Sequence, residues 1–318
     1  MTVVEVLVLR GASPSSVAIT VELLQTANQI RIASGRLPPF SVRLTGSGAK
    51  AAQSYFGVGA AASVEKADVL VVPGLALTNE EAVIEGLSRK DAVAARRRLM
   101  EAFTQGAEIA SSCSAVFLVA AAGVLDGRRA TTSWWLSPLF RRLYPAVSLD
   151  TDAMVVTDGR VTTAGAAMAQ MDLMLSVIAR HSDVSLAERC ARYMLLEERK
   201  SQARYMAIGF LSGADEQISR AERWARKRLE ENFPIGALAE AAGLTARTFA
   251  RRLERTTGLS PVRFLQRLRV ERAVELLETT RLPFDEIARR VGYAEPSTLR
   301  RLLRREGGLG AREIRSLV

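Results

Sequence analysis

Few residues of this chain could carry nucleophilic or metal chemistry: two cysteines, Cys113 and Cys190, and a single histidine, His181. Two cysteines cannot build a disulfide framework, and one histidine cannot build a His-rich metal site. The lone histidine also excludes Ser-His-Asp and Cys-His catalysis unless His181 itself serves. We therefore expect no metal and no cofactor. Cys190 lies in an amphipathic stretch, AERCARYMLLEE, and is predicted to be a buried structural thiol.

Cys113 has the more chemically interesting setting. It follows the strand-like run Glu108–Ser111 and precedes a helical pattern over 115–122. A side chain at that junction lies at the carboxyl edge of a sheet and close to a helix N-terminus, which stabilises a thiolate. Taken alone, this is the outline of a cysteine nucleophile elbow, so an enzyme has to be considered.

The elements that must position Cys113 indicate an α/β fold. Short apolar runs alternate with helical patterns: the runs cover 3–9, 41–45, 68–72, 108–111 and 154–157, and the helical patterns cover 17–32, 80–103, 115–122 and 166–180. This alternation predicts a largely parallel, open sheet of the flavodoxin-like kind. The Pro73-Gly74 pair directly after DVLVV marks a strand end, where such sheets place ligand sites.

The rest of the chain is predicted to be helical. Its 318 residues suit two ordinary domains. We predict an α/β domain over 1–182, a helical linker over 183–215 with its best boundary at 212–214, and an all-α domain over 216–318. No stretch is long and apolar enough for a membrane span, and the N-terminus reads as a buried strand rather than a secretion signal. A cytoplasmic protein is the expectation.

Positive charge is concentrated in the last third of the chain. The whole chain carries a net charge of +10, and residues 216–318 hold 22 Lys and Arg against 14 Asp and Glu, a net of +8. All of those basic residues except Lys227 are arginine. Arginine suits phosphate and guanine edges, so the charge favours nucleic acid over a merely solvated helical face.

The same third contains one pattern twice, over 235–261 and 284–311. Leu238, Ala239, Gly243, Phe249, Leu253 and Gly258 recur as Ile287, Ala288, Gly292, Leu299, Leu303 and Gly308. Each copy has the pattern typical of a helix-turn-helix: a short helix, a glycine turn and a second helix whose apolar residues share one face. Outward on the two second helices we expect Arg247, Thr248, Arg251, Arg252 and Arg255, and Ser297, Thr298, Arg301, Arg304 and Arg305.

The segment between the copies, PVRFLQRLRVERAVELLETT, is predicted to be one helix that begins with proline in its first turn. It would hold two reader helices at a fixed separation, so that they enter successive major-groove segments about 34 Å apart. A plain helical bundle is the alternative, but it does not require the same glycine-turned pattern twice.

Residues 216–318 resemble the DNA-binding domain of the AraC family of transcription regulators. The likeness rests on RFLQRLRVERAVELL followed by PFDEIARRVGYAEPSTLRRLLRREGGLGAREIR. It implies base contacts from Arg247 and Arg251 in the first copy, and from Ser297, Thr298 and Arg301 in the second. Gly310-Ala311 departs from the family, which usually has a proline there.

Residues 1–180 resemble the PfpI-like, class I glutamine-amidotransferase-like fold. AAAGVLDGRRATTSWW together with DGRVTTAGAAMAQMDLML is similar to the sensor domain of GlxA-type AraC regulators. Enzymes of this fold support the cysteine with a histidine and an acid; here Ser133 stands at the histidine position and Ser16 at the acid position, with Glu22 about two turns further on. Without a proton carrier the site is interpreted as a retired active site reused as a ligand pocket.

Pocket residues are predicted at the strand ends. The candidates are Gly74, Leu75, Ser112, Cys113, Ser114, Trp134 and Trp135. The two tryptophans either pack in the core or stack on a quaternary ammonium ligand in the pocket.

The resulting hypothesis is a non-enzymatic transcription regulator that binds double-stranded promoter DNA, responds to a small-molecule effector and dimerises through its sensor, with RNA polymerase as a further candidate partner. One alternative is a cysteine-dependent hydrolase or amidotransferase, or a thiol sensor, tethered to DNA. Another is an architectural DNA binder without a ligand.

Overall fold

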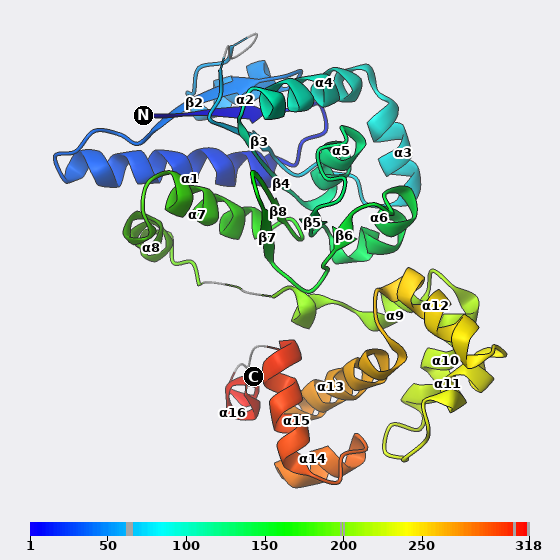
Figure 1. Cartoon of the computed structure of the whole chain (residues 1–318). Coiled ribbons are helices and arrows are strands. Elements are labelled where there is room, and N and C mark those ends of the chain that lie inside the picture. Colours follow the sequence, from blue (N-terminus) through cyan, green and yellow to red (C-terminus); the bar gives the residue numbers. More distant parts are fainter. Residues whose placement is uncertain (62–65, 198, 200, 308–309, 317–318) are drawn as a thin grey trace. The chain divides into compact units, whose positions relative to one another are not determined.

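The computed structural model describes residues 1–61, 66–197, 199, 201–307 and 310–316 (Figure 1). The chain divides into two compact units, Met1–Gln202 and Ala203–Val318. The linker predicted over 183–215 is thus shared between the two units. Within the described residues, no helix is both long enough and apolar enough to cross a membrane.

The first unit is built on a six-stranded sheet with strand order β2-β1-β3-β4-β8-β7. The strands are β1 (Thr2–Leu7), β2 (Phe40–Thr45), β3 (Val69–Val72), β4 (Glu108–Ser112), β7 (Val155–Asp158) and β8 (Val161–Ala164). All neighbouring pairs are parallel except β7 with β8. The predicted α/β class and largely parallel sheet are confirmed.

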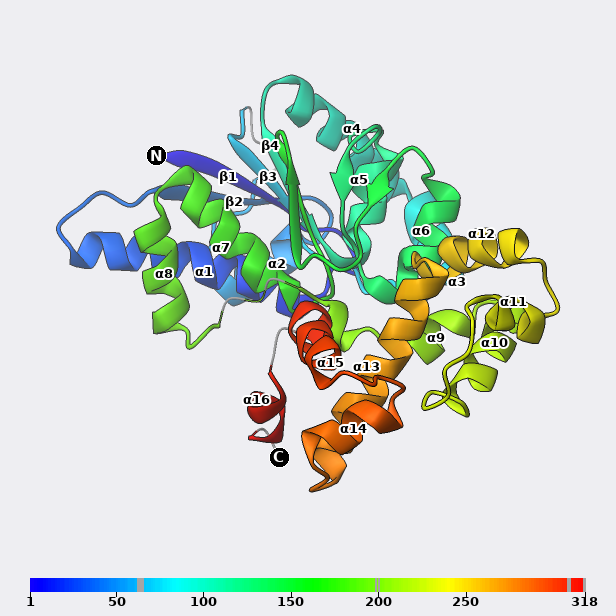
Figure 2. The same cartoon turned by 60° about the horizontal axis from the view of Figure 1, so that its bottom comes forward.

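Helices cover both faces of this sheet, as Figures 1 and 2 show. One face packs against α1 (Pro14–Ala33), α2 (Ala49–Phe56), α7 (Ala169–His181) and α8 (Val184–Tyr193). The other packs against α3 (Glu80–Ser88), α4 (Lys90–Thr104), α5 (Val116–Ala121) and α6 (Ser137–Leu143). Along β3, Val69 and Val71 face the first core and Leu70 and Val72 the second, because successive side chains point to opposite faces.

Two local differences from the sequence prediction have simple causes. The single helix expected over 80–103 is two helices, because the backbone of Arg89 is extended, with φ −62° and ψ 147°. A short two-stranded sheet of β5 (Arg129–Ala130) and β6 (Ser148–Leu149) was not expected, since two-residue strands carry no periodic signal.

The second unit is helical throughout its described residues. Its elements are a 3₁₀ turn, η3 (Ala203–Tyr205), then α9 (Ile208–Ser212), α10 (Glu216–Arg226), α11 (Gly236–Ala242), α12 (Ala246–Thr257), α13 (Pro261–Thr279), α14 (Phe284–Arg290), α15 (Pro296–Leu302), a π turn η4 (Leu303–Gly307) and α16 (Ala311–Arg315).

Helix α13 belongs to two separate hydrophobic cores. Phe264, Leu265 and Leu268, in its N-terminal half, pack with α10, α11 and α12. Val270, Ala273 and Leu277, further along, pack with α14, α15 and α16. The predicted connecting helix is therefore present, and each half of it anchors one copy of the repeat.

Candidate functional site

Cys113 lies at a strained turn between β4 and α5. It begins the 3₁₀ turn η1 (Cys113–Ala115) with φ +55°, a left-handed conformation that is uncommon for a residue with a side chain. Its N–H donates to the Gly165 carbonyl over 2.8 Å, and its own carbonyl accepts from Thr132 Oγ1 over 2.7 Å. The thiol is 6% exposed. The elbow geometry expected from the sequence is present.

Ser133 and Ser16, which stand at the histidine and acid positions of the enzymes, both lie near this thiol. Ser133 Oγ donates to Cys113 Sγ over 3.0 Å. Ser16 is fully buried, and its hydroxyl has no hydrogen-bond partner among the described residues. A Cβ placed on Gly74 would be 2.9 Å from Ser16 Oγ and 3.2 Å from Cys113 Cβ, so the three residues meet. Both positions thus carry a hydroxyl, and a serine hydroxyl is not a proton carrier near neutral pH.

The two other candidate proton carriers, Glu22 and His181, lie elsewhere. Glu22 is exposed. His181 Nε2 pairs with Glu108 Oε2 over 3.1 Å, and Glu108 begins β4 whereas Cys113 follows its last residue. His181 therefore lies at the amino end of β4, whereas the thiol lies at its carboxyl end.

The other predicted pocket residues around Cys113 are engaged within the protein. Ser112 Oγ donates to Gln170 Oε1, and Gln170 Nε2 donates to Thr20 Oγ1 over 2.8 Å. Ser114 Oγ donates to the Leu75 carbonyl. Gly74, Leu75, Ser112, Cys113 and Ser114 therefore lie together at the carboxyl ends of β3 and β4. The rings of Trp134 and Trp135 meet edge to face, with centroids 5.5 Å apart.

Gln202, the last residue of the first unit, is inserted behind this cluster. It is 1% exposed, and its Nε2 donates to Thr131 Oγ1 and to the Thr132 carbonyl, each over 3.0 Å. Gly165 leaves room for it, since a Cβ there would lie 2.3 Å from Gln202 Oε1. Sequence reasoning missed this residue, because no motif marks a buried glutamine in a connector.

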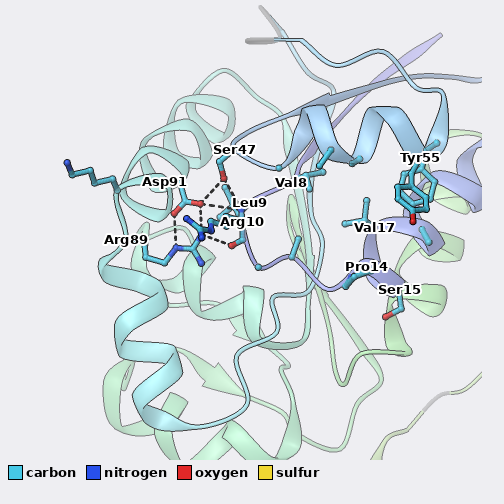
Figure 3. A pocket seen from close by; sticks show the side chains of 18 residues that line it. Val8, Leu9, Arg10, Pro14, Ser15, Val17, Ser47, Tyr55, Arg89 and Asp91 are labelled. Carbon is cyan, nitrogen blue, oxygen red and sulfur yellow. Dashed lines mark hydrogen bonds and ion pairs between the residues drawn. The ribbon is translucent and has the colours of Figure 1, made fainter.

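A cavity of about 1080 Å3 opens on the same edge of the sheet, between α1, α2 and the start of α4. Its walls include Val8, Val17, Ala52 and Tyr55, and a hydrogen-bonded group of Arg89, Asp91 and Ser47 lies at one end (Figure 3). None of the predicted pocket residues lines it. The sequence offered no signal for it, because its walls come from three separate segments.

Asp91 is the ionised carboxylate of the hydrogen-bonded group of Arg89, Asp91 and Ser47. Partial burial raises its pKa, but hydrogen bonds from Ser47 and Arg89 and the charge of Arg89 outweigh burial, so the pKa lies below its ordinary value.

The second cysteine lies away from both sites. Burial raises the pKa of the Cys190 thiol to about 11. Cys190 is fully buried in α8, which confirms it as a structural thiol.

In the second unit, each copy of the repeat folds as two helices joined at a left-handed glycine. Gly243 has φ +68° between α11 and α12, and Gly292 has φ +80° between α14 and α15. The small residues at the helix crossings, Ala239 and Ala288, are buried. The apolar residues predicted to point inward, Phe249 and Leu253, and Leu299 and Leu303, are each at most 1% exposed.

The predicted outward residues divide into free and engaged groups. Arg247, Arg251, Arg255, Ser297, Arg301, Arg304 and Arg305 are exposed, and Thr248, Arg252 and Thr298 are half-buried. Arg252 pairs with Asp215, and Arg305 Nη2 pairs with Glu306 over 2.7 Å. Within the described residues, no carboxylate pairs with Arg247, Arg251, Arg255, Arg301 or Arg304. These five cations are available to an anionic partner.

A buried ion pair fixes the segment that follows α15. Arg267 on α13 and Glu306 on η4 are each 3% exposed, with Nε and Oε2 2.8 Å apart. Arg263 Nη2 lies 3.4 Å from the same carboxylate. Arg267 Nη1 also donates to the Ala203 carbonyl over 2.7 Å. Glu306 therefore joins α13 to the turn that follows α15.

Comparison with known proteins identifies both parts of the chain. Residues 6–180 match the DJ-1/PfpI family, and residues 238–316 match a helix-turn-helix domain. The chain is 23% identical over 214 residues to the HTH-type transcriptional regulator GbdR of Pseudomonas aeruginosa, covering 66% of this chain and 58% of the relative. It is 26% identical over 196 residues to GlxA of Rhizobium meliloti, covering 60% of each.

Two solved structures match about three-fifths of the chain. An AraC family transcriptional regulator from Pseudomonas putida is 21% identical, covers 61% of this chain and 100% of its own, and has a TM-score of 0.46. Drosophila melanogaster DJ-1beta is 19% identical. The match covers 62% of this chain and 99% of the DJ-1beta chain, with a TM-score of 0.44. The matched region spans about three-fifths of the length of the curated relatives.

Proposed function

Because the chain belongs to the DJ-1/PfpI family over residues 6–180 and carries a helix-turn-helix domain over residues 238–316, we propose that it is a DNA-binding transcription regulator. The observation that carries this proposal is the pair of glycine-turned motifs packed on one helix, α13, with Arg247, Arg251 and Arg301 exposed and without carboxylate partners. HTH-type transcriptional regulators are among the proteins that it resembles.

The geometry supports reading of double-stranded DNA by α12 and α15. Each half of α13 holds one motif in its own core, so the spacing of the two reader helices is set by a continuous helix rather than by a loop. Two readers fixed in this way suit successive major-groove segments. Arg251 and Arg301 contact base edges in this proposal, and Arg255 and Arg304 contact phosphates, which attract arginine irrespective of sequence.

The α/β unit is the sensor in this proposal. It binds a small-molecule effector and mediates dimerisation, so that two copies read paired half-sites in promoter DNA in the cytoplasm. RNA polymerase is the partner through which such a regulator would act. The cluster around Cys113 is suited to binding rather than catalysis, since Ser133 and Ser16 stand where a base and an acid would be needed.

A binding selection on full-length protein tests the DNA assignment. Random duplexes bound by the wild-type chain should converge on one motif, and Arg251→Ala or Arg301→Ala should each relax part of it, at a cost of about 1–3 kcal/mol. Arg36→Ala, an exposed arginine of the α/β unit, removes the same charge and should leave the motif unchanged. Selection of no motif by the wild-type chain would refute sequence-specific binding.

Thiol chemistry is the second candidate function, and the strained backbone at Cys113 is the observation that favours it. Replacement of the thiol decides between the two. Cys113→Ser and Cys113→Ala should both bind the selected DNA as the wild type does, because the thiol then contributes only shape and a weak hydrogen bond. A covalent adduct on Cys113 in wild-type protein, together with a regulatory response lost in both variants, would establish thiol chemistry instead.

A further inference from the structure

The cavity of about 1080 Å3 lies where an open α/β sheet places its ligands. In the strand order β2-β1-β3-β4-β8-β7, the chain runs from β1 to β2 on one side and then crosses to β3 on the other side of β1, which places the topological switch between β1 and β3. Helices α1 and α2 approach the carboxyl end of β1 from one face of the sheet, and the start of α4 approaches from the other. Crevices at such points bind ligands in this class of fold.

The cavity is preformed by a close approach of two loops. Gly48 N–H donates to the Val8 carbonyl over 2.9 Å, so the segment after β2 is bonded to the segment after β1. Gly46 has φ +92°, and a Cβ there would lie 2.5 Å from the Val8 carbonyl oxygen. Only glycine permits this contact. The floor of the cavity is therefore held by backbone bonds and needs no ligand to form.

The two ends of the cavity differ in chemistry, as Figure 3 shows. One end is apolar, with Val8 and Val17 beside the aromatic ring of Tyr55. The other end holds Arg10, Arg89, Asp91 and Ser47. An apolar body with a few polar groups at one end is the usual composition of a small-molecule site.

The polar end has an excess of positive charge. Arg89 donates to Asp91 through Nε and Nη2, at 3.1 and 2.7 Å, so this pair is neutral as a unit. The Arg10 backbone is fixed by Ser47 Oγ, which accepts its N–H over 2.8 Å. Within the described residues, no carboxylate pairs with the Arg10 guanidinium. The exposed Arg10 guanidinium is thus a cation at this end of the cavity that no carboxylate of the described residues neutralises.

Helix termini add to this field. The first residues of three helices line the cavity: Pro14 and Ser15 of α1, Lys90 and Asp91 of α4, and Gly48, which precedes α2. The N-terminal ends of helices carry partial positive charge and favour anions.

We propose that this cavity binds a small organic carboxylate with an apolar body, its carboxylate on Arg10 and its body along α1 and α2. That the bound acid is the effector rests on the proposed regulatory function; the binding itself does not. The site is distinct from the Cys113 cluster, whose residues do not line it.

Straight-chain acids are the probe, used below their micelle concentrations with the full-length chain. Calorimetric titration should show saturable binding within the series hexanoate, octanoate and decanoate. 1-Octanol should bind about tenfold more weakly than octanoate, because it lacks the charge, and octylammonium should not bind. No saturable binding of any of these acids would overturn the proposal.

Matched variants locate the bound acid. Ala51 is an exposed residue of α2 that lines the cavity, and Lys50 is its exposed neighbour that does not. Ala51→Trp should abolish octanoate binding, whereas Lys50→Trp should retain it. Arg10→Gln should weaken octanoate about tenfold and leave 1-octanol unchanged. Wild-type octanoate binding by Ala51→Trp, or its loss in Cys113→Ala instead, would place the site elsewhere.

Two further readouts separate this proposal from its rivals. If Ala51→Trp changes a dimer into a monomer, and the wild-type chain binds no acid, the cavity is a surface between two copies and the proposal is wrong. If octanoate binds as expected but no DNA motif is selected, the ligand site stands and the regulatory function fails. If a motif is selected but no acid binds, the regulatory function stands and the ligand site fails.

Discussion

The two helix-turn-helix copies share a sequence pattern but are held in place by different means. The first reader helix, α12, has twelve residues, begins with a side-chain cap from Thr245 and ends at Gly258 with φ +75°. The second, α15, has seven residues, no side-chain cap, and continues into the π turn that carries the buried Glu306. The first copy relies on local helix signals, and the second on tertiary contacts.

This difference shows that two copies of one sequence pattern can be stabilised by different interactions. Local caps contribute about 1 kcal/mol each, whereas loss of a buried charge partner or a backbone clash costs several times more. The second motif should therefore be the more sensitive of the two to single substitutions, although its reader helix is shorter. Three paired substitutions test this, in order of decreasing effect.

The turn glycines should show the largest contrast. Both have positive φ, so alanine at either costs about 1–2 kcal/mol in backbone strain. At Gly243 nothing lies closer to a new Cβ than Arg220 Nη1 at 4.0 Å, but at Gly292 the Leu229 carbonyl oxygen would be 2.2 Å away. Gly292→Ala should therefore cost about 5 kcal/mol in total, since a backbone atom must move.

Hydrogen exchange on the full-length chain measures this contrast motif by motif. Amides of α14 and α15 should lose most of their protection in Gly292→Ala, and those of α11 and α12 should lose little in Gly243→Ala. Equal losses in the two variants would show that the tertiary contact of Gly292 contributes nothing beyond φ.

The carboxylates that hold the reader helices come next. Glu306→Gln leaves Arg267 buried without a full counter-charge, which should destabilise the second motif by about 3 kcal/mol. Asp215 also pairs with a reader-helix arginine, Arg252, but that side chain is 38% exposed. Asp215→Asn keeps an acceptor for the N–H groups of Gln217 and Ile218 and should cost about 1 kcal/mol.

Footprinting gives the functional side of that comparison. Glu306→Gln should lose protection of the DNA segment read by α15 and keep protection of the segment read by α12. Uniform weakening over both segments would mean that Glu306 supports the whole unit rather than the placement of one reader.

Much of this architecture was predictable because its signals are local. Alternating apolar runs located β1, β2, β3 and β4, and the repeated glycine spacing located both motifs. The hydrophobic pattern over 80–103 could not reveal the break at Arg89, whose extended backbone follows from packing and not from its own propensity. Strand β8, with the sequence VTTA, is too short and too polar to stand out.

Sites assembled from distant residues were harder to predict. The contact of Ser133 with Cys113 was found only through family resemblance, since neither residue predicts the other from spacing. The cavity beside α1 and α2 was missed, because Arg10, Ser47 and Asp91 come from three separate segments that no motif connects. Glu306 was missed because a single glutamate in an arginine-rich helix looks like a solvated charge.

The smallest contrast lies at the starts of the reader helices. Thr245 Oγ1 accepts the N–H of Thr248 over 3.3 Å, so Thr245→Ala leaves that donor unpaired and should destabilise the first motif by about 1 kcal/mol. Glu295 occupies the same position before α15 but makes no side-chain cap, and Pro296 already fixes the first turn. Glu295→Ala should therefore stay within about 0.5 kcal/mol of wild type. Hydrogen exchange of the first turns of α12 and α15 measures both, with Thr245→Ser as the control that keeps the hydroxyl. A larger loss from Glu295→Ala than from Thr245→Ala would reverse the comparison, because the second motif would then also depend on a local helix signal.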